Sequence, residues 1–227
     1  MTCFGNPMPR KRLIRNDWNP YHVTARVNNR EDFYLPLAEQ WEIFNHECFI
    51  LRNTYDVEFH GFVMMPNHIH LILTVPDPDH DLGKIMSVFL SQVTLSSNRK
   101  SGRNGHLFGG PYHWTLIDSA RYFYHAIKYI YRNPVRAGIC EKVEDYPFST
   151  FAGLFGRTSL PFPIHFTRAG MEYLLPSPDP VEWVDWLNRP FESELEKRIQ
   201  GSLRKRIFGP KMNRKTRSLD SWLALDS

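Results

Sequence analysis

The chain has 227 residues, 42% of them hydrophobic and 23% charged, with a net charge of +4 at pH 7 and a pI near 9.0. This length allows one domain with a hydrophobic core plus an extension, and the charge permits a polyanionic partner without requiring one. No apolar run approaches the roughly 20 residues that span a bilayer, and the basic N-terminus lacks a signal-peptide core. The odd, scattered cysteines exclude a disulfide framework, so we expect a reduced, cytoplasmic protein with no membrane association.

The first half of the chain predicts a strand, a helix and a hairpin. Residues 21–27 alternate in polarity, which is typical of a half-buried strand, and apolar residues at helical spacing predict a helix over about 35–53. A second strand is predicted over 57–65. Pro66-Asn67 ends it, and a third strand over about 68–75 follows so closely that the two are expected to pair.

A second helix is predicted from Leu82, ending in the loop before Gly105, and a fourth strand over about 112–117. Asp118-Ser119 is a good N-cap for a third helix, and Asn133-Pro134 is expected to end it. The order β-α-β-β-α-β, then a helix, predicts an α+β, ferredoxin-like (split βαβ) fold: a four-stranded antiparallel sheet with helices on one face. The other face is expected to be open.

The composition changes after Gly138. Proline becomes frequent from about residue 157, and two short amphipathic stretches follow, at about 180–187 and 191–207. We therefore expect residues 1–156 to form the main domain and residues 157–227 to form a C-terminal extension with a basic tail.

Two histidines stand out in the third predicted strand, MPNHIHLILTV. Because successive side chains of a strand point to opposite faces, His68 and His70 share a face, where His22, Thr24 and Arg26 of the first strand also lie. A pair of imidazoles held side by side on a strand favours metal ligation. The alternative is a histidine pair on a solvated sheet face.

The third predicted helix carries a second candidate pair. Tyr129 and Asn133 are one turn apart on the same face, whereas Tyr131 lies about 200° around the helix from Tyr129. An aromatic residue in such a helix usually packs in the core. The amide oxygen one turn from Tyr129, however, could be a third metal ligand.

An ordered set of motifs connects these features: MPNHIHLIL, then GHLF at 105–108, then KYIYRNPVRAG, then DYPFSTF at 145–151. Residues from about 17 to 155 resemble the REP-associated tyrosine transposases, which are bacterial single-tyrosine HUH endonucleases. One departure is the Gly109-Gly110-Pro111 segment, where family members commonly have a basic residue. The resemblance makes residues 1–156 the catalytic domain.

The resemblance implies that Tyr129 is the nucleophile, that His68 and His70 bind a divalent ion, Mg²⁺ or Mn²⁺, and that Asn133 completes the metal site. It implies cleavage and rejoining of single-stranded or hairpin DNA of the REP type, through a 5′-phosphotyrosine intermediate. A monomer is expected, with a dimer as the alternative. Two other functions stay open: a catalytically idle hairpin-binding module and a metallohydrolase that uses metal-bound water.

Basic residues are expected to contact DNA phosphates, although a charge run can also be a solvated face. They lie near the start of the chain, around the predicted site and near the end: Arg10, Lys11, Arg12, Arg15, Arg26, Arg99, Lys100, Arg103, Arg132, Arg136, Arg204, Lys205 and Arg206.

Overall fold

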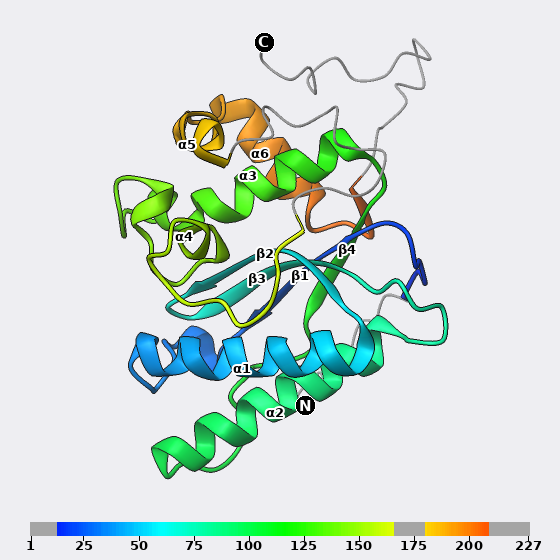
Figure 1. The fold of residues 1–227 in the computed structure, drawn as a ribbon, viewed down its shortest axis with the longest axis vertical. Coiled ribbons are helices and arrows are strands. Elements are labelled where there is room, and N and C mark those ends of the chain that lie inside the picture. The colour runs from blue at the N-terminus through cyan, green and yellow to red at the C-terminus, as the bar shows by residue number, and fades with distance from the viewer. Residues whose placement is uncertain (1–12, 166–179, 209–227) are drawn as a thin grey trace, which may run out of the picture.

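The computed structural model describes residues 13–165 and 180–208. Its elements follow one another along the chain as shown in Figure 1. They are β1 (Tyr21–Arg26), η1 (Asn28–Arg30), α1 (Leu37–Tyr55), β2 (Glu58–Met65), β3 (His68–Thr74), α2 (Leu82–Ser101), β4 (His113–Ile117), α3 (Ala120–Arg136), η2 (Val143–Asp145), α4 (Thr150–Leu154), α5 (Pro180–Asn188), α6 (Ser193–Ser202) and β5 (Ile207–Phe208).

One sheet joins all the strands in the order β2-β3-β1-β4-β5. The pairs β2–β3, β3–β1 and β1–β4 are antiparallel, and β5 runs parallel to β4. The predicted α+β class is confirmed, as is the order of strands and helices up to α3. The sheet has five strands rather than four because a two-residue strand from the extension joins its edge, and so short a strand leaves no periodic signal.

Helices cover both faces of the sheet, so the predicted open face is wrong. α1 and α2 lie on one side, and α3 with α5 and α6 lies on the other (Figure 1). The second side has its own buried core, which joins Val63, Met65 and Ile72 of the sheet to the apolar side of α3. The physical reason is that α3 is apolar on more than one side: Phe123 and Ile127 are buried, and Tyr124 contacts Trp183 of α5.

The start of α3 is as predicted, and its end is not. The Ser119 hydroxyl accepts a hydrogen bond from the Tyr122 amide, which caps the helix. The helix then continues through Pro134 to Arg136. Proline removes one backbone hydrogen bond, but only the last turn follows it, and the Ala137 amide still donates to the Asn133 carbonyl. Arg136 therefore lies on the helix, three residues after Asn133.

The described part of the extension, residues 180–208, packs into the same core as α3. Trp183, Leu187 and Ile199 are buried there. The Thr115 hydroxyl of β4 contacts the carbonyl oxygens of Leu203 and Lys205 at 2.6 and 2.7 Å. This part of the extension is consequently integrated with the main domain. Within the described ranges, no helix is long and apolar enough to cross a membrane.

Candidate active site

The four residues singled out by the motifs come together where α3 crosses β3. The ring centroids of His68 and His70 are 4.9 Å apart, and the Tyr129 ring stands edge-on to His70 at 6.0 Å. Asn133 follows one turn after Tyr129 on the same face of α3. His70, Tyr129 and Asn133 are only 6%, 7% and 3% exposed, so the phenol lies in a partly enclosed site.

Each histidine of the pair has a partner for its Nδ1 atom. His68 Nδ1 lies 2.5 Å from Asn67 Oδ1, and His70 Nδ1 lies 2.9 Å from Nε2 of His22 on β1. Proteins commonly hold a metal-binding imidazole in this way, because a hydrogen bond to one nitrogen orients the ring and leaves the other nitrogen for the metal. In both rings that other nitrogen is Nε2.

The imidazoles of the site are neutral at neutral pH. Burial lowers the pKa of His68 to about 4, and the nearby Arg26 and Arg136 guanidinium groups act in the same direction. Burial also lowers the pKa of His22 to about 4 and that of His70 well below its usual value. Metal ligation requires the neutral ring, so the site favours the binding-competent form.

Arg136 connects Tyr129 to Asn133. Its Nη2 atom donates to Asn133 Oδ1 at 2.8 Å and lies 3.5 Å from the Tyr129 hydroxyl oxygen. The guanidinium carbon is 5.1 Å from the centre of the Tyr129 ring, and Nη1 faces Glu196 of α6 at 3.5 Å. The sequence predicted Arg136 only as a DNA contact, since the helix was expected to end before it.

The donor set fits a divalent ion through two imidazole nitrogens and one amide oxygen. Across residues 13–165 and 180–208, no group of three or more His, Cys, Asp or Glu side chains could hold a metal. The predicted third ligand is the amide side chain of Asn133. Its Oδ1 accepts from Arg136 and keeps one lone pair, while its buried Nδ2 has no hydrogen-bond partner among the described residues. Asn133 would thus share its oxygen between Arg136 and the ion.

The neighbouring tyrosines of α3 are unsuited to act as nucleophiles. The Tyr131 hydroxyl bonds to Thr150 Oγ1 at 2.9 Å, and burial raises the pKa of this phenol. Tyr124 is fully buried between Phe123 and Trp183. Tyr129 is therefore the tyrosine of α3 that faces the histidine pair.

Arg26 lies beside the site. It is the strand partner of His68 and is exposed. Its guanidinium lowers the pKa of both His68 and His70, which places a positive charge next to the histidine pair. Arg26 and Arg136 are thus predicted DNA contacts that lie close to the histidine pair.

Arg132 has a different environment. Its guanidinium donates to the carbonyl oxygens of Leu187 and Asn188, at the end of α5, at 2.9 and 2.5 Å. These hydrogen bonds hold the end of α5 against α3, so Arg132 has a structural role that needs no contact with DNA.

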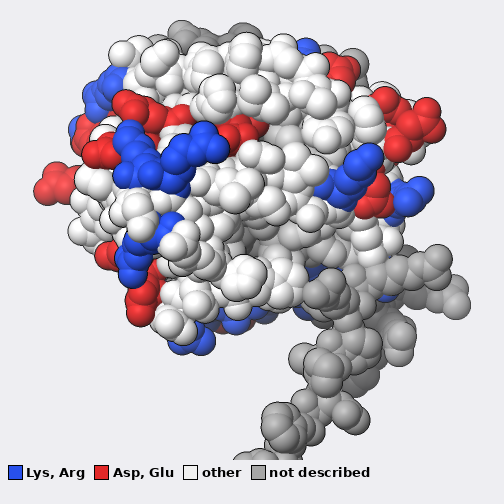
Figure 2. Space-filling model, turned by 90° about the horizontal axis from the view of Figure 1, so that it is seen from below, with Lys and Arg blue, Asp and Glu red and all other residues white. Residues whose placement is uncertain are grey.

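Three predicted DNA contacts lie at the end of α2 or just after it, on the opposite side of the sheet from Tyr129. Lys100 pairs with Glu39 and Glu42 of α1, and Arg103 lies over the Tyr34 ring at 4.7 Å. Figure 2 shows basic and acidic side chains interleaved on this side of the molecule. The α2 cations, Arg99 included, therefore do not extend the positive charge around Tyr129.

The remaining predicted DNA contacts that the structure describes lie near the two ends of the described chain. Arg206 lies over the Trp114 ring at 5.9 Å, next to Arg204 and Lys205 at the edge formed by β4 and β5. Arg15 pairs with Asp81 at 3.0 Å. Arg10, Lys11 and Arg12 lie outside the described residues.

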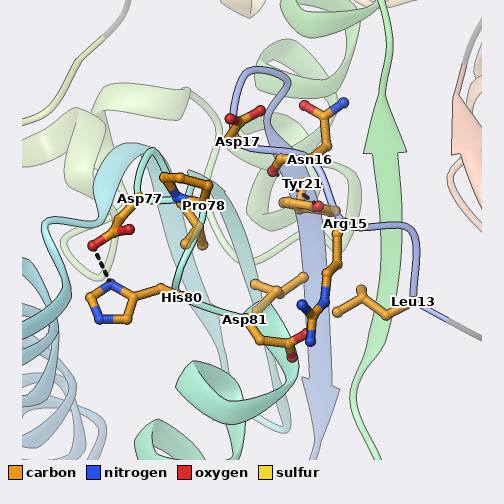
Figure 3. A pocket seen from close by; sticks show the side chains of 11 residues that line it. Leu13, Arg15, Asn16, Asp17, Tyr21, Asp77, Pro78, His80 and Asp81 are labelled. Atoms are coloured by element: carbon orange, nitrogen blue, oxygen red, sulfur yellow. Dashed lines mark hydrogen bonds and ion pairs between the residues drawn. The ribbon is translucent and has the colours of Figure 1, made fainter.

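A cavity of about 220 Å³ lies between the segment that precedes β1, which includes Arg15, and the loop that precedes α2 (Figure 3). Two contacts lie in its wall: Arg15 pairs with Asp81 at 3.0 Å, and His80 Nδ1 lies 3.3 Å from Asp77 Oδ2. None of the four motif residues lines it. The cavity is thus separate from the candidate active site.

Comparison with known proteins agrees with the motifs. The REP-associated tyrosine transposase of Escherichia coli is 29% identical over 132 residues, which cover 58% of this chain and 75% of the relative. A protein of Haemophilus influenzae named as a candidate member of the same family is 27% identical over 142 residues, covering 58% and 78%. No family model matches the chain.

The fold is shared with a solved REP-associated tyrosine transposase bound to a REP hairpin. That structure has a TM-score of 0.57 and 23% sequence identity, and the match covers 71% of this chain and 94% of the other. The chain is similar to REP-associated tyrosine transposases, so the resemblance predicted from its sequence is confirmed.

Proposed function

We propose that this chain is a metal-dependent endonuclease and strand transferase for single-stranded DNA, acting through a 5′-phosphotyrosine intermediate on REP-type hairpins. The observation that carries the proposal is the position of Tyr129, edge-on to His70 and within reach of Arg136. The similarity to REP-associated tyrosine transposases, one of which was solved with a REP hairpin, supports the choice of substrate.

The Tyr129 oxygen would attack a DNA phosphorus in line with the departing 3′ oxygen. A bond forms between the phenol oxygen and phosphorus, the bond to the 3′ oxygen breaks, and the phenol loses its proton as the 3′ oxygen gains one. A divalent ion held by His68, His70 and Asn133 would supply charge neutralisation at the phosphate oxygens. Because the phosphotyrosine bond conserves the energy of the phosphodiester, a second 3′-OH can attack it and rejoin the strand.

The residues around the phenol have separate tasks in this reaction. Arg136 places a positive charge beside the Tyr129 hydroxyl, where the phenolate and the phosphate would carry negative charge. Arg26 offers a second cation at the exposed side of His68, where the DNA backbone would enter. The 7% exposure of Tyr129 favours a flexible single strand, because a stacked duplex cannot bring its phosphate so close to α3.

One alternative has an observation in its favour. A catalytically idle hairpin-binding module would explain why Asn133 Oδ1 is bonded to Arg136 and why Tyr129 is largely covered. Such a module would bind the hairpin and leave it intact.

A cleavage assay separates these functions. The full chain is incubated with Mn²⁺ and a single-stranded oligonucleotide that carries a REP-type hairpin, and the products are separated on a denaturing gel. We expect a protein band that carries the DNA label. Bound but uncut DNA would favour the idle module, and cut DNA without the adduct would favour attack by metal-bound water.

A further inference from the structure

We propose that His22 is a positioning residue for the metal ligand His70, a role that rests on the proposed function above. His22 lies on β1, the strand next to β3, and is 3% exposed. Its Nε2 atom is 2.9 Å from His70 Nδ1. The two rings stack with centroids 5.2 Å apart and planes 14° from parallel, so His22 holds both the position and the tilt of the His70 ring.

The hydrogen bond between the two rings controls which nitrogen of His70 is free. If His22 Nε2 accepts the bond, the proton of His70 is on Nδ1, and Nε2 presents its lone pair to a metal ion. If His22 Nε2 donates instead, the proton of His70 is on Nε2, and that nitrogen cannot bind a metal. Metal binding at His70 therefore requires His22 to be the acceptor.

This requirement gives His22 an unusual protonation pattern. As an acceptor at Nε2, neutral His22 carries its own proton on Nδ1, which is buried and has no partner among the described residues. In the opposite arrangement the same nitrogen is a buried lone pair without a partner, so Nδ1 of His22 is unsatisfied in both tautomers and the bond to His70 is what distinguishes them. Binding of a metal at His70 Nε2 would select the arrangement in which His22 Nε2 accepts, with no change in the total number of protons on the two rings.

Two substitutions at His22 test the role. In His22→Gln, the side-chain carbonyl oxygen can accept a hydrogen bond from His70 Nδ1–H without any change of tautomer. His22→Leu fills the same space but supplies no hydrogen-bond acceptor. Calorimetric titration with Mn²⁺ alone should show that Gln retains most of the affinity and that Leu loses about 10–100-fold, the usual effect of removing such an outer partner. His60→Leu is the control, because His60 is also a buried imidazole of the sheet but bonds to Thr74.

Imidazole ¹⁵N NMR of the wild-type protein supplies a readout that does not depend on activity. With diamagnetic Zn²⁺ bound, His22 should be in the Nδ1–H tautomer, and Zn²⁺ should bind to neither of its nitrogens. Direct coordination of Zn²⁺ by His22, or unchanged Mn²⁺ affinity in His22→Leu, would overturn the inference.

His68→Ala separates this inference from the proposed function. If His68→Ala loses Mn²⁺ binding while His22→Leu keeps it, the metal site stands and only the role of His22 is wrong. If neither substitution changes Mn²⁺ binding, the metal site itself is wrong, and the role of His22 is wrong with it.

Discussion

The candidate site joins side chains from β1, β3 and α3: His22 contacts His70, and the His70 ring stands against Tyr129. Alternation in a strand placed His68 and His70 on one face, helical spacing placed Tyr129 and Asn133 on one face, and the structure brings the two pairs together. The contacts of His22 and Arg136 were not predicted. A strand pattern gives the face of a residue but not its cross-strand neighbours, so the bond between His22 and His70 needs the sheet register.

The metal site should depend on both histidines of the pair. We expect His68→Ala and His70→Ala each to weaken Mn²⁺ binding by more than about 100-fold, since loss of a ligand exceeds the loss of an outer partner. Calorimetric titration measures the affinity, and circular dichroism checks the fold. Thr24→Ala, on the same sheet face, is the matched control, and wild-type affinity in either histidine variant would contradict the assignment.

The buried imidazoles should make the protein sensitive to acid. Burial holds the pKa of His22 at about 4 in the folded protein, below its ordinary 6.5, so the unfolded chain binds more protons between these values. The free energy of unfolding should hence be largest above pH 6.5 and fall as the pH decreases towards 4. Urea titrations across this range should show a shallower fall for His22→Gln, and equal slopes would count against a buried neutral His22.

Arg136 and Arg132 form a matched pair on α3, because one faces Tyr129 and the other faces α5. We expect Arg136→Gln to slow cleavage by about 100-fold at saturating DNA, the usual effect of losing one group that stabilises developing charge. Arg132→Gln should instead lower the free energy of unfolding by about 1–3 kcal/mol, because two carbonyl oxygens lose their donor. The reverse pattern of effects would exclude these roles.

At the scale of elements, the sequence predicted where most helices and strands begin and end. Besides the two-residue β5, two expectations failed. Asn133-Pro134 was expected to end α3, yet a proline in the last turn costs too little to stop the helix. Because the helix was expected to end before Arg136, the contacts of Arg136 with Tyr129 and Asn133 were not predicted either. The second failure was the open sheet face, because a helix with several apolar sides can dock on a sheet and still accept α5 and α6 on its outer side.

At the scale of the whole molecule, the extension is the part that the sequence described least well. Its short helices were expected to be packed on or tethered to the core, and the structure packs them: Leu187 and Ile199 are fully buried, as is Phe208 of β5. The structure also changes which basic residues can be assigned to the candidate active site. Within residues 13–165 and 180–208, the predicted DNA contacts are divided between the Tyr129 side, the α2 side and the ends of the described chain, and among them Arg26 and Arg136 lie at the candidate active site.

Two truncations separate the structural and DNA-binding parts of the C-terminal end. Removal of residues 203–227 takes away the buried Leu203 and Phe208, so we expect unfolding at lower temperature. Removal of residues 209–227 takes away only residues outside the described structure, including Lys211, Arg214, Lys215 and Arg217.

The shorter truncation should weaken hairpin binding and leave cleavage at saturating DNA largely unchanged. The slope of log affinity against log salt should flatten by roughly 0.7–0.9 for each DNA phosphate that the tail neutralises in the full chain. Fluorescence anisotropy at several salt concentrations measures this slope. An unchanged slope would assign the tail to solubility rather than to DNA.

The most direct test of the central claim is to identify the residue that becomes attached to DNA. The full chain is reacted with Mn²⁺ and a hairpin-bearing single strand, digested with protease, and the DNA-linked peptide is sequenced by mass spectrometry. We predict that Tyr129 carries a 5′-phosphate linkage, that the other product has a free 3′-OH, and that Tyr129→Phe gives no adduct while Tyr131→Phe still does. An adduct on another residue, or an adduct that persists in Tyr129→Phe, would contradict the account.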